Sequence, residues 1–142
     1  MGNMHDFKLL KCDAESSLQS DLESLFRSEW LDFTFDGYSS GLPSPLVVFS
    51  GKRVIGGLAY TFYQEPNSSN VVIWLNAVFV LPEFRGHGIA SQLINGALQQ
   101  LSSHQQDILY AYTDIPDLYL SLNWSQVNVE TELNHKVMSI TL

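Results

Sequence analysis

Between residues 71 and 101, a strand-forming segment is followed by a turn with two glycines and then by an amphipathic helix. This succession restricts the possible folds more than any other feature of the chain. Residues 71–80 are rich in Val, Ile, Trp and Phe, which favour strands. Residues 89–101 place apolar side chains at helical spacing along one face. Because another strand-forming run follows at 108–112, the three elements predict a βαβ crossover, which is right-handed in nearly all proteins.

The rest of the chain adds strands and helices on both sides of this unit. In chain order these are an apolar strand at 7–10, a helix at 15–30, a loop at 31–45, strands at 46–49 and 54–63, helical turns at 116–122, and strands at 124–129 and 136–142. Asp13 or Ser16 is a candidate cap for the first helix. The predicted fold class is α/β of the α+β type, with a mixed, mostly antiparallel sheet of about six or seven strands flanked by helices. Since 142 residues suit one hydrophobic core and no linker divides them, we expect residues 1–142 to form a single domain.

The chain is acidic, which limits its partners. Seven Lys and Arg residues stand against fifteen Asp and Glu residues, for a formal charge of −8. So few cations cannot build the basic stripe of a nucleic-acid binder or a polybasic membrane anchor. We therefore expect no nucleic-acid or membrane partner, and a cationic small molecule or basic peptide instead.

Cysteine and histidine usage gives no sign of a disulfide or a metal site. Cys12 is the only cysteine, and the four histidines show no spacing typical of metal ligands. The first residues also lack the basic and apolar regions of a secretory signal. These features predict a cytoplasmic location and no metal cofactor.

The glycine turn at residues 85–90 is suited to binding an anion. Glycine allows positive φ angles and close approach of a ligand to the backbone. The first amides of a helix have no internal partner, and the helix dipole adds positive potential there, so phosphate or pyrophosphate binds well. The alternative is a turn whose glycines only relieve backbone strain. A Walker loop is excluded because no Gly-Lys-Ser/Thr ending is present, and the Rossmann pattern is incomplete.

Two segments of the chain resemble the GCN5-related N-acetyltransferases. The acetyl-CoA motif of that family is Gln/Arg-x-x-Gly-x-Gly/Ala, and Arg85-Gly86-His87-Gly88-Ile89-Ala90 matches it. Downstream, Leu118-Tyr119-Leu120-Ser121-Leu122-Asn123-Trp124 is similar to the family's Leu-Tyr-x-x-x-Gly-Phe/Trp segment. Asn123 replaces the glycine, a mild departure because Asn tolerates positive φ.

The resemblance implies a binding site for acetyl-CoA as co-substrate. The pyrophosphate would lie on the amides of Arg85, Gly86, His87, Gly88, Ile89 and Ala90, with the Ser91 hydroxyl beside them. Pantetheine would lie along the strand at Val78 and Val80, where the amide of Val80 would polarise the thioester carbonyl. We interpret His87 as a solvent-facing neighbour of phosphate, and Arg85 as a surface cation that assists by charge.

The same resemblance assigns catalytic candidates. Tyr119 corresponds to the general acid that protonates the leaving thiolate; the alternative is a ring buried for packing alone. Asn76 stands near the position where many relatives carry a Glu base, and it could orient a water molecule. Glu29, Asp32 or Asp114 could serve as base, and an amine that arrives neutral needs no strong base.

The acceptor site and the oligomeric state are less defined. We expect an acceptor pocket formed by the 30–38 segment, the hairpin turn at 50–53 and the strand residues Tyr60 and Phe62. Aromatic and acidic residues are interleaved in the 30–38 segment; the alternative is packing of a long loop on the core. The apolar C-terminal residues Val137, Met138, Ile140 and Leu142 would permit a homodimer, or would form one last core strand.

Two main functions follow from these features, and an O-acetyl or longer-acyl transferase is a third option. The first is an acetyl-CoA-dependent N-acetyltransferase that moves the acetyl group directly to a primary amine of a small molecule or peptide. The second is a non-catalytic acyl-CoA-binding sensor or interaction module of the same fold, suggested by Asn76 in place of a carboxylate.

Overall fold

The computed structural model describes residues 7–12, 17–38 and 40–142. Its elements are β1 (Phe7–Lys11), α1 (Ser17–Arg27), β2 (Leu46–Ser50), β3 (Arg53–Gln64), β4 (Val71–Val80), the 3-10 turn η1 (Pro82–Phe84), α2 (Ile89–Leu101), β5 (Ile108–Thr113), α3 (Pro116–Ser121), β6 (Ser125–Val127) and β7 (Lys136–Thr141). The predicted bounds of β4 and α2 are confirmed. The helix predicted at 15–30 is shorter, and its candidate caps Asp13 and Ser16 lie outside the described residues.

All seven strands belong to one sheet, in the order β1-β2-β3-β4-β5-β7-β6. Among the strand pairs of the described residues only β4–β5 is parallel, so the predicted mixed and mostly antiparallel sheet is confirmed. β7 lies between β5 and β6 and is therefore an internal strand. Because Val137 and Met138 on β7 are buried, these residues form a core strand, and a homodimer stays an untested prediction.

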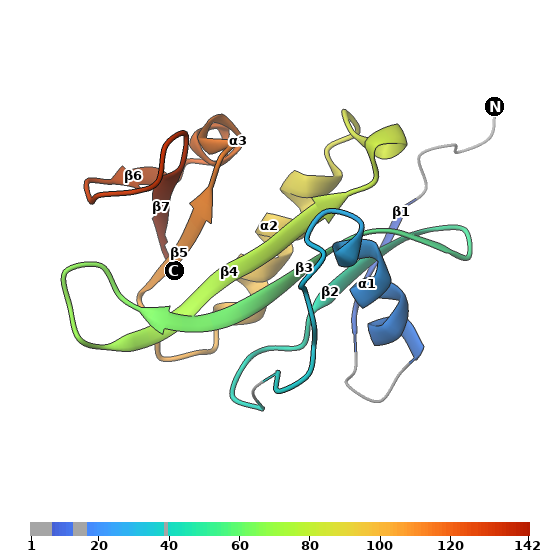
Figure 1. Ribbon diagram of the computed structural model, residues 1–142, viewed down its shortest axis with the longest axis horizontal. Helices are drawn as coiled ribbons and strands as arrows, with labels where there is room; N and C mark the ends of the chain where they lie inside the picture. The colour runs from blue at the N-terminus through green and yellow to red at the C-terminus, as the bar shows by residue number, and fades with distance from the viewer. Residues whose placement is uncertain (1–6, 13–16, 39) are drawn as a thin grey trace.

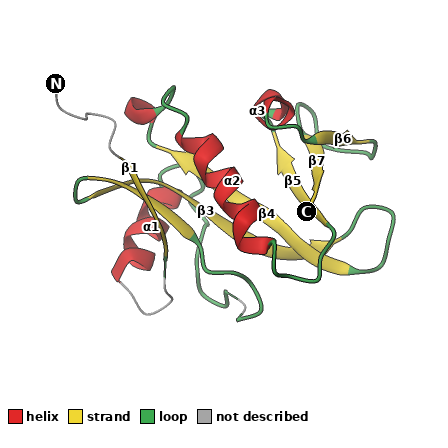
Figure 2. Cartoon of the chain, turned by 180° about the vertical axis from the view of Figure 1, so that it is seen from behind, coloured by secondary structure: helices red, strands yellow, loops and turns green. Residues whose placement is uncertain are grey.

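The helices cover the two faces of the sheet. α1 lies on one face (Figure 1), whereas α2 and α3 lie on the other (Figure 2). On the first face, Leu22, Leu25 and Phe26 of α1 pack beside Phe79. α1 approaches closely because Gly57 has no side chain: a β-carbon there would overlap the side chain of Leu22. The larger core lies between the sheet and α2, which explains the buried apolar face of that helix.

A β-bulge at Asn76 gives β4 its unusual shape. Ala59 pairs with Ala77 and Tyr60 with Leu75, so Asn76 is an extra residue in the ladder. Before the bulge Leu75 faces the α2 side, and after it Val78 and Val80 do so. A bulge bends its strand and increases the local twist. It comes where β4 leaves β5, because the parallel pairing involves only Trp74 with Tyr110 and Leu75 with Ala111.

None of the helices in the part of the chain that the structure describes has the length and apolar character required to cross a membrane.

Candidate active site

The two parallel strands diverge beyond Leu75 (Figure 1). A cavity of about 610 Å³ lies in the opening. Its wall on the α1 side includes Glu29 and Trp30. Its wall on the opposite side includes Ala90 of α2 and Tyr119 of α3. The cavity therefore extends through the sheet, so two ligands entering from opposite faces could meet inside it.

The open edge of β4 directs backbone amides into this space. Leu81 donates its N–H to the carbonyl of Ile55 on the next strand, at 2.8 Å. In a strand, backbone groups of successive residues point to opposite edges. Val80 and Val78 therefore direct their N–H and C=O groups away from β3, toward the gap left by β5. The Val80 amide therefore faces the space in which the prediction places the thioester carbonyl.

Arg85 is tied to the end of the same strand. Its Nε donates to the carbonyl of Val80 at 2.8 Å, and its guanidinium lies 5.3 Å from the centre of the Phe79 ring. Arg85 is exposed, as predicted for a surface cation, and these two contacts orient its side chain. Since Arg85 also lines the cavity, it places a positive charge beside the Val80 peptide.

The glycine turn presents the first amides of α2 without obstruction. Gly86 has φ 84° and Gly88 has φ 78°, angles that L side chains rarely adopt. A β-carbon built on Gly86 or Gly88 meets nothing within 4 Å, so the space beside the turn is open. No side chain caps the helix, and its first turn holds no acidic residue. The first amides can therefore bind an anion, which the helix dipole also favours.

Tyr119 of α3 lines the cavity. Its side chain is only 4% exposed, and its ring packs edge-on against Trp124 with centroids 5.0 Å apart. Burial raises the pKa of Tyr119, which keeps the phenol protonated. Asn123, which replaces the expected glycine, has φ 71°, as its tolerance for positive φ predicts.

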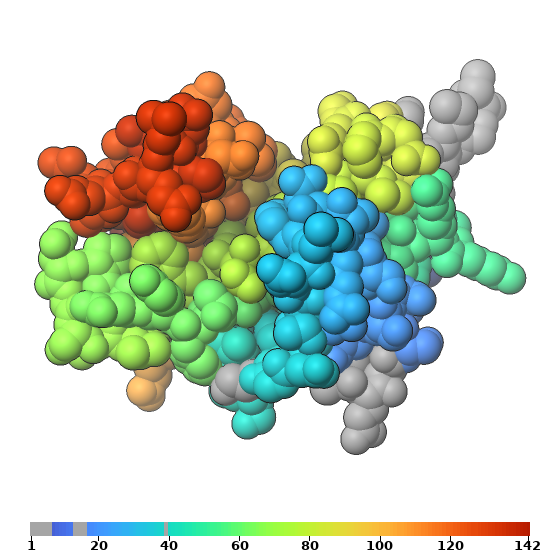
Figure 3. All heavy atoms as spheres, in the orientation of Figure 1, coloured from blue at the N-terminus to red at the C-terminus, as the bar shows by residue number. Residues whose placement is uncertain are grey.

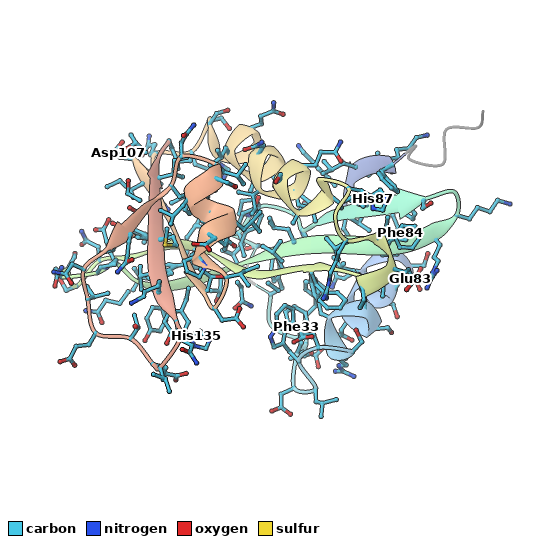
Figure 4. All side chains as sticks on the ribbon, turned by 90° about the horizontal axis from the view of Figure 1, so that it is seen from above. Phe33, Glu83, Phe84, His87, Asp107 and His135 are labelled. Atoms are coloured by element: carbon cyan, nitrogen blue, oxygen red, sulfur yellow. The ribbon has the colours of Figure 1, made fainter. Side chains whose placement is uncertain are left out.

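The structure brings most of the predicted site residues together. Asn76, Val78, Val80, Arg85, Ile89, Ala90 and Tyr119 line the cavity. Gly86 lies in the glycine turn and Ser91 in the first turn of α2, and neither residue lines the cavity. His87 and Gly88 line a separate hollow with Phe7 and Gln92. His87 is exposed, as predicted, and its Nδ1 lies 3.0 Å from the carbonyl of Phe84 (Figure 4).

The predicted acceptor residues on β3 are wrong. Tyr60 is buried on the α2 side, where its hydroxyl donates to Gln100 at 2.6 Å. Phe62 lies on the same side by strand alternation and lines a pocket with residues 104–108. In the 30–38 segment Trp30 lines the cavity, whereas Phe33, Phe35 and Tyr38 pack on the α1 side of the sheet, which is the packing alternative.

A second cavity of about 770 Å³ lies between the β3–β4 hairpin and the loop before β7. Trp74, Tyr63 and Tyr112 supply aromatic walls, and three carboxylates come from Glu65, Glu130 and Glu132. Leu75, Asn76 and Tyr112 line both cavities, so the two spaces adjoin at the bulge. The space-filling view shows a hollow between the C-terminal strands and the hairpin on this face (Figure 3).

Several groups near the bulge could accept a proton. Glu29 and Asp114 line the first cavity, but Asp32 does not. His135 also lines it, although the scattered histidines gave no sign of this in the sequence. No group of three or more His, Cys, Asp or Glu side chains in the described ranges could hold a metal ion.

An open strand edge, a helix N-terminus without a side-chain cap and a buried tyrosine beside one cavity are the features expected of an acyl-CoA-dependent acyltransferase site. A family model described as the acetyltransferase (GNAT) family matches residues 8–120. The chain therefore belongs to the acetyltransferase (GNAT) family, and its enzyme class is that of the acyltransferases. Acetyl-CoA is the acetyl donor of this family, which agrees with the predicted co-substrate.

Solved structures share the fold at low sequence identity. The GNAT family N-acetyltransferase YhbS of Escherichia coli in complex with CoA is 17% identical, with TM-score 0.75, over 95% of this chain and 81% of that chain. Arabidopsis thaliana Naa50 in complex with the bisubstrate analogue CoA-Ac-MVNAL is 16% identical, with TM-score 0.70, over 96% and 99%. An aminoglycoside 6'-N-acetyltransferase complexed with coenzyme A is 15% identical, with TM-score 0.74, over 94% and 96%. No curated protein sequence matches the chain significantly.

Proposed function

We propose that this enzyme transfers the acetyl group of acetyl-CoA directly to a primary amine of a small molecule or peptide. The observation that carries the proposal is the cavity through the sheet, because it holds the open edge of Val80 and the phenol of Tyr119 together. In this scheme acetyl-CoA enters from the α2 side, with its pyrophosphate on the amides of residues 85–90. The amine enters from the α1 side and attacks the acetyl carbon.

Each catalytic group has one role in this proposal. The Val80 amide stabilises the negative charge that develops on the thioester oxygen. Tyr119 donates its proton to the sulfur as the carbon–sulfur bond breaks, and Asn76 orients the amine or a water at the bulge. Cys12 is fully buried and does not line the cavity, which favours direct transfer over an acyl-enzyme.

The proposal is tested by measuring first the binding of acetyl-CoA and then the acetylation of amines. Calorimetric titration with acetyl-CoA is expected to show one site, and release of free thiol is expected when a panel of primary amines is added. Binding without turnover across diamines, aminoglycosides and peptides would favour the non-catalytic sensor or interaction module. Absence of binding would remove both functions.

We further propose that the second cavity selects a cationic acceptor. Glu65 is positioned by Tyr110, whose hydroxyl donates to its Oε2 at 3.0 Å. Burial, and then the neighbouring Glu65 carboxylate, raise the pKa of Tyr110 to about 12, so this donor stays protonated. Two more carboxylates, from Glu130 and Glu132, line the same cavity, and its three aromatic residues favour an ammonium by cation–π attraction.

Replacing Glu65 with glutamine is expected to raise KM for a dicationic amine about fivefold, equivalent to ~1 kcal/mol, with kcat retained. Glutamine still accepts a hydrogen bond from Tyr110, so only the charge is lost. Steady-state kinetics at two salt concentrations would measure the effect, which should shrink at high salt. The matched control is Asp21→Asn, an exposed charge on α1 that lines neither cavity. An equal change of KM in both variants would contradict the proposed acceptor cavity.

The proposed location is the cytoplasm, on the ground that a chain with one cysteine forms no intrachain disulfide.

A further inference from the structure

A histidine that the sequence did not single out lies in the reaction cavity. His135 is the residue before β7, it is half-buried, and it lines the same cavity as Asn76 and Tyr119. Seen from above, His135 projects on the same side of the sheet as Phe33, opposite α2 (Figure 4). In the proposed function this is the side from which the amine enters, whereas Tyr119 lies on the side of acetyl-CoA.

The hydrogen bond of its ring determines which nitrogen can take a proton. Nδ1 of His135 lies 3.1 Å from the carbonyl oxygen of Leu133. A carbonyl oxygen can only accept, so Nδ1 carries the hydrogen in this contact. In the neutral ring Nε2 then holds the lone pair, and His135 is in the tautomer that a general base requires.

The ring and its loop are held in place by several further contacts. The imidazole stacks on Tyr112 of β5, with centroids 4.9 Å apart and planes 17° apart. The Tyr112 hydroxyl accepts the N–H of Glu132 at 3.0 Å. The Thr131 hydroxyl donates to the carbonyl of His135 at 2.6 Å. Positioning of this kind is what proton transfer between aligned groups requires.

The other groups in the cavity are less suited to the role. The Asn76 amide cannot take a proton at neutral pH. Glu29 and Asp114 are exposed, and carboxylates are weaker bases near neutral pH than imidazole, the side chain whose proton affinity suits that range.

We infer that His135 is the general base of the acetyl transfer, an inference that rests on the proposed function. The amine nitrogen forms a bond to the acetyl carbon, and Nε2 of His135 takes the proton that the amine loses. The carbon–sulfur bond breaks, and the thiolate takes the phenolic proton of Tyr119. His135 then releases its proton to solvent and Tyr119 regains one, so charge and protons balance over the cycle.

The deciding experiment is the pH dependence of kcat/KM in the His135→Asn enzyme. Asparagine can still donate to the Leu133 carbonyl, but it cannot accept the amine proton. We expect kcat/KM to fall about a hundredfold at neutral pH and to recover as pH rises, because more of the amine then arrives neutral. For the wild-type enzyme, kcat/KM is expected to level off at a lower pH than for the variant.

Other charged and titratable groups near His135 could also affect the pH profile of kcat/KM. Those that share the cavity with His135 are Glu29, Arg85, Tyr112, Asp114 and Tyr119, and those beside it in the chain are Glu132 and Lys136. The matched control is His104→Asn, since His104 is exposed in the loop between α2 and β5 and does not line the cavity. Its profile should match the wild type.

Three outcomes are distinguishable. A His135→Asn enzyme with the rate and pH profile of the wild type would overturn the role of His135 while the proposed function stands. A wild-type enzyme that binds acetyl-CoA but turns over no amine would overturn both. If the asparagine variant does not fold, as judged by its thermal transition, His135→Gln is assayed in its place and judged by the same profile.

Discussion

Replacing Tyr119 with phenylalanine is expected to lower kcat by about a hundredfold while the affinity for acetyl-CoA changes little. Tyr119 is only 4% exposed and lines the cavity from α3. Because burial raises the pKa of Tyr119, the hydroxyl stays protonated through the neutral range and can donate to a leaving thiolate. Phenylalanine retains the ring that packs on Trp124, so the variant removes the proton donor and little else. Steady-state kinetics and calorimetric titration with acetyl-CoA measure the two quantities.

The matched control is Tyr60→Phe. The Tyr60 hydroxyl is also buried, but it donates to Gln100 on the α2 side and does not line the cavity. This variant should lose about 1 kcal/mol in the free energy of unfolding and keep the wild-type kcat. If kcat of the Tyr119→Phe enzyme equals that of the wild type, solvent protonates the thiolate and the acid role is wrong.

The local parts of the fold could be read from the sequence because they depend on periodicity and turn residues. The run at 71–80 and the apolar face at 89–101 predict β4 and α2 with the bounds observed. The glycines between them predict a turn with positive φ, and both Gly86 and Gly88 have it. These features alone predict where the phosphate end of the candidate site would lie.

The reacting end of the site depends on tertiary structure, and the sequence gives little sign of it. The bulge at Asn76 reverses which residues of β4 face α2, and no residue pattern in the strand marks it. His135 reaches the cavity because β7 pairs antiparallel with β5, in a register that places Val137 opposite Tyr112. That register joins segments more than twenty residues apart, so neither composition nor local spacing reveals it. The same limitation explains why Tyr60 does not lie in the predicted acceptor pocket.

Substituting Gly88 is expected to weaken acetyl-CoA binding at least tenfold, which is about 1.4 kcal/mol. Gly88 has φ 78° and precedes the first residue of α2, so its own conformation directs the helix amides toward the ligand. In Gly88→Ala, the left-handed backbone costs about 1–2 kcal/mol, and the new methyl group occupies open space where the pyrophosphate would lie. Titration with acetyl-CoA and chemical denaturation would separate lost affinity from lost stability.

Two companion variants distinguish backbone strain from obstruction of the phosphate site. Gly51 in the β2–β3 turn has φ 62° and equally open surroundings, so Gly51→Ala should lose a similar amount of stability and keep full affinity for acetyl-CoA. Asparagine already occupies positive φ in this chain at Asn67, Asn123 and Asn134, so Gly88→Asn should fold with less strain while its side chain still covers the amides. Weak binding by Gly88→Asn would therefore place the pyrophosphate against this turn. Wild-type affinity in that variant would instead mean that the glycines serve only the backbone, and that the anion binds elsewhere on the α2 side of the cavity.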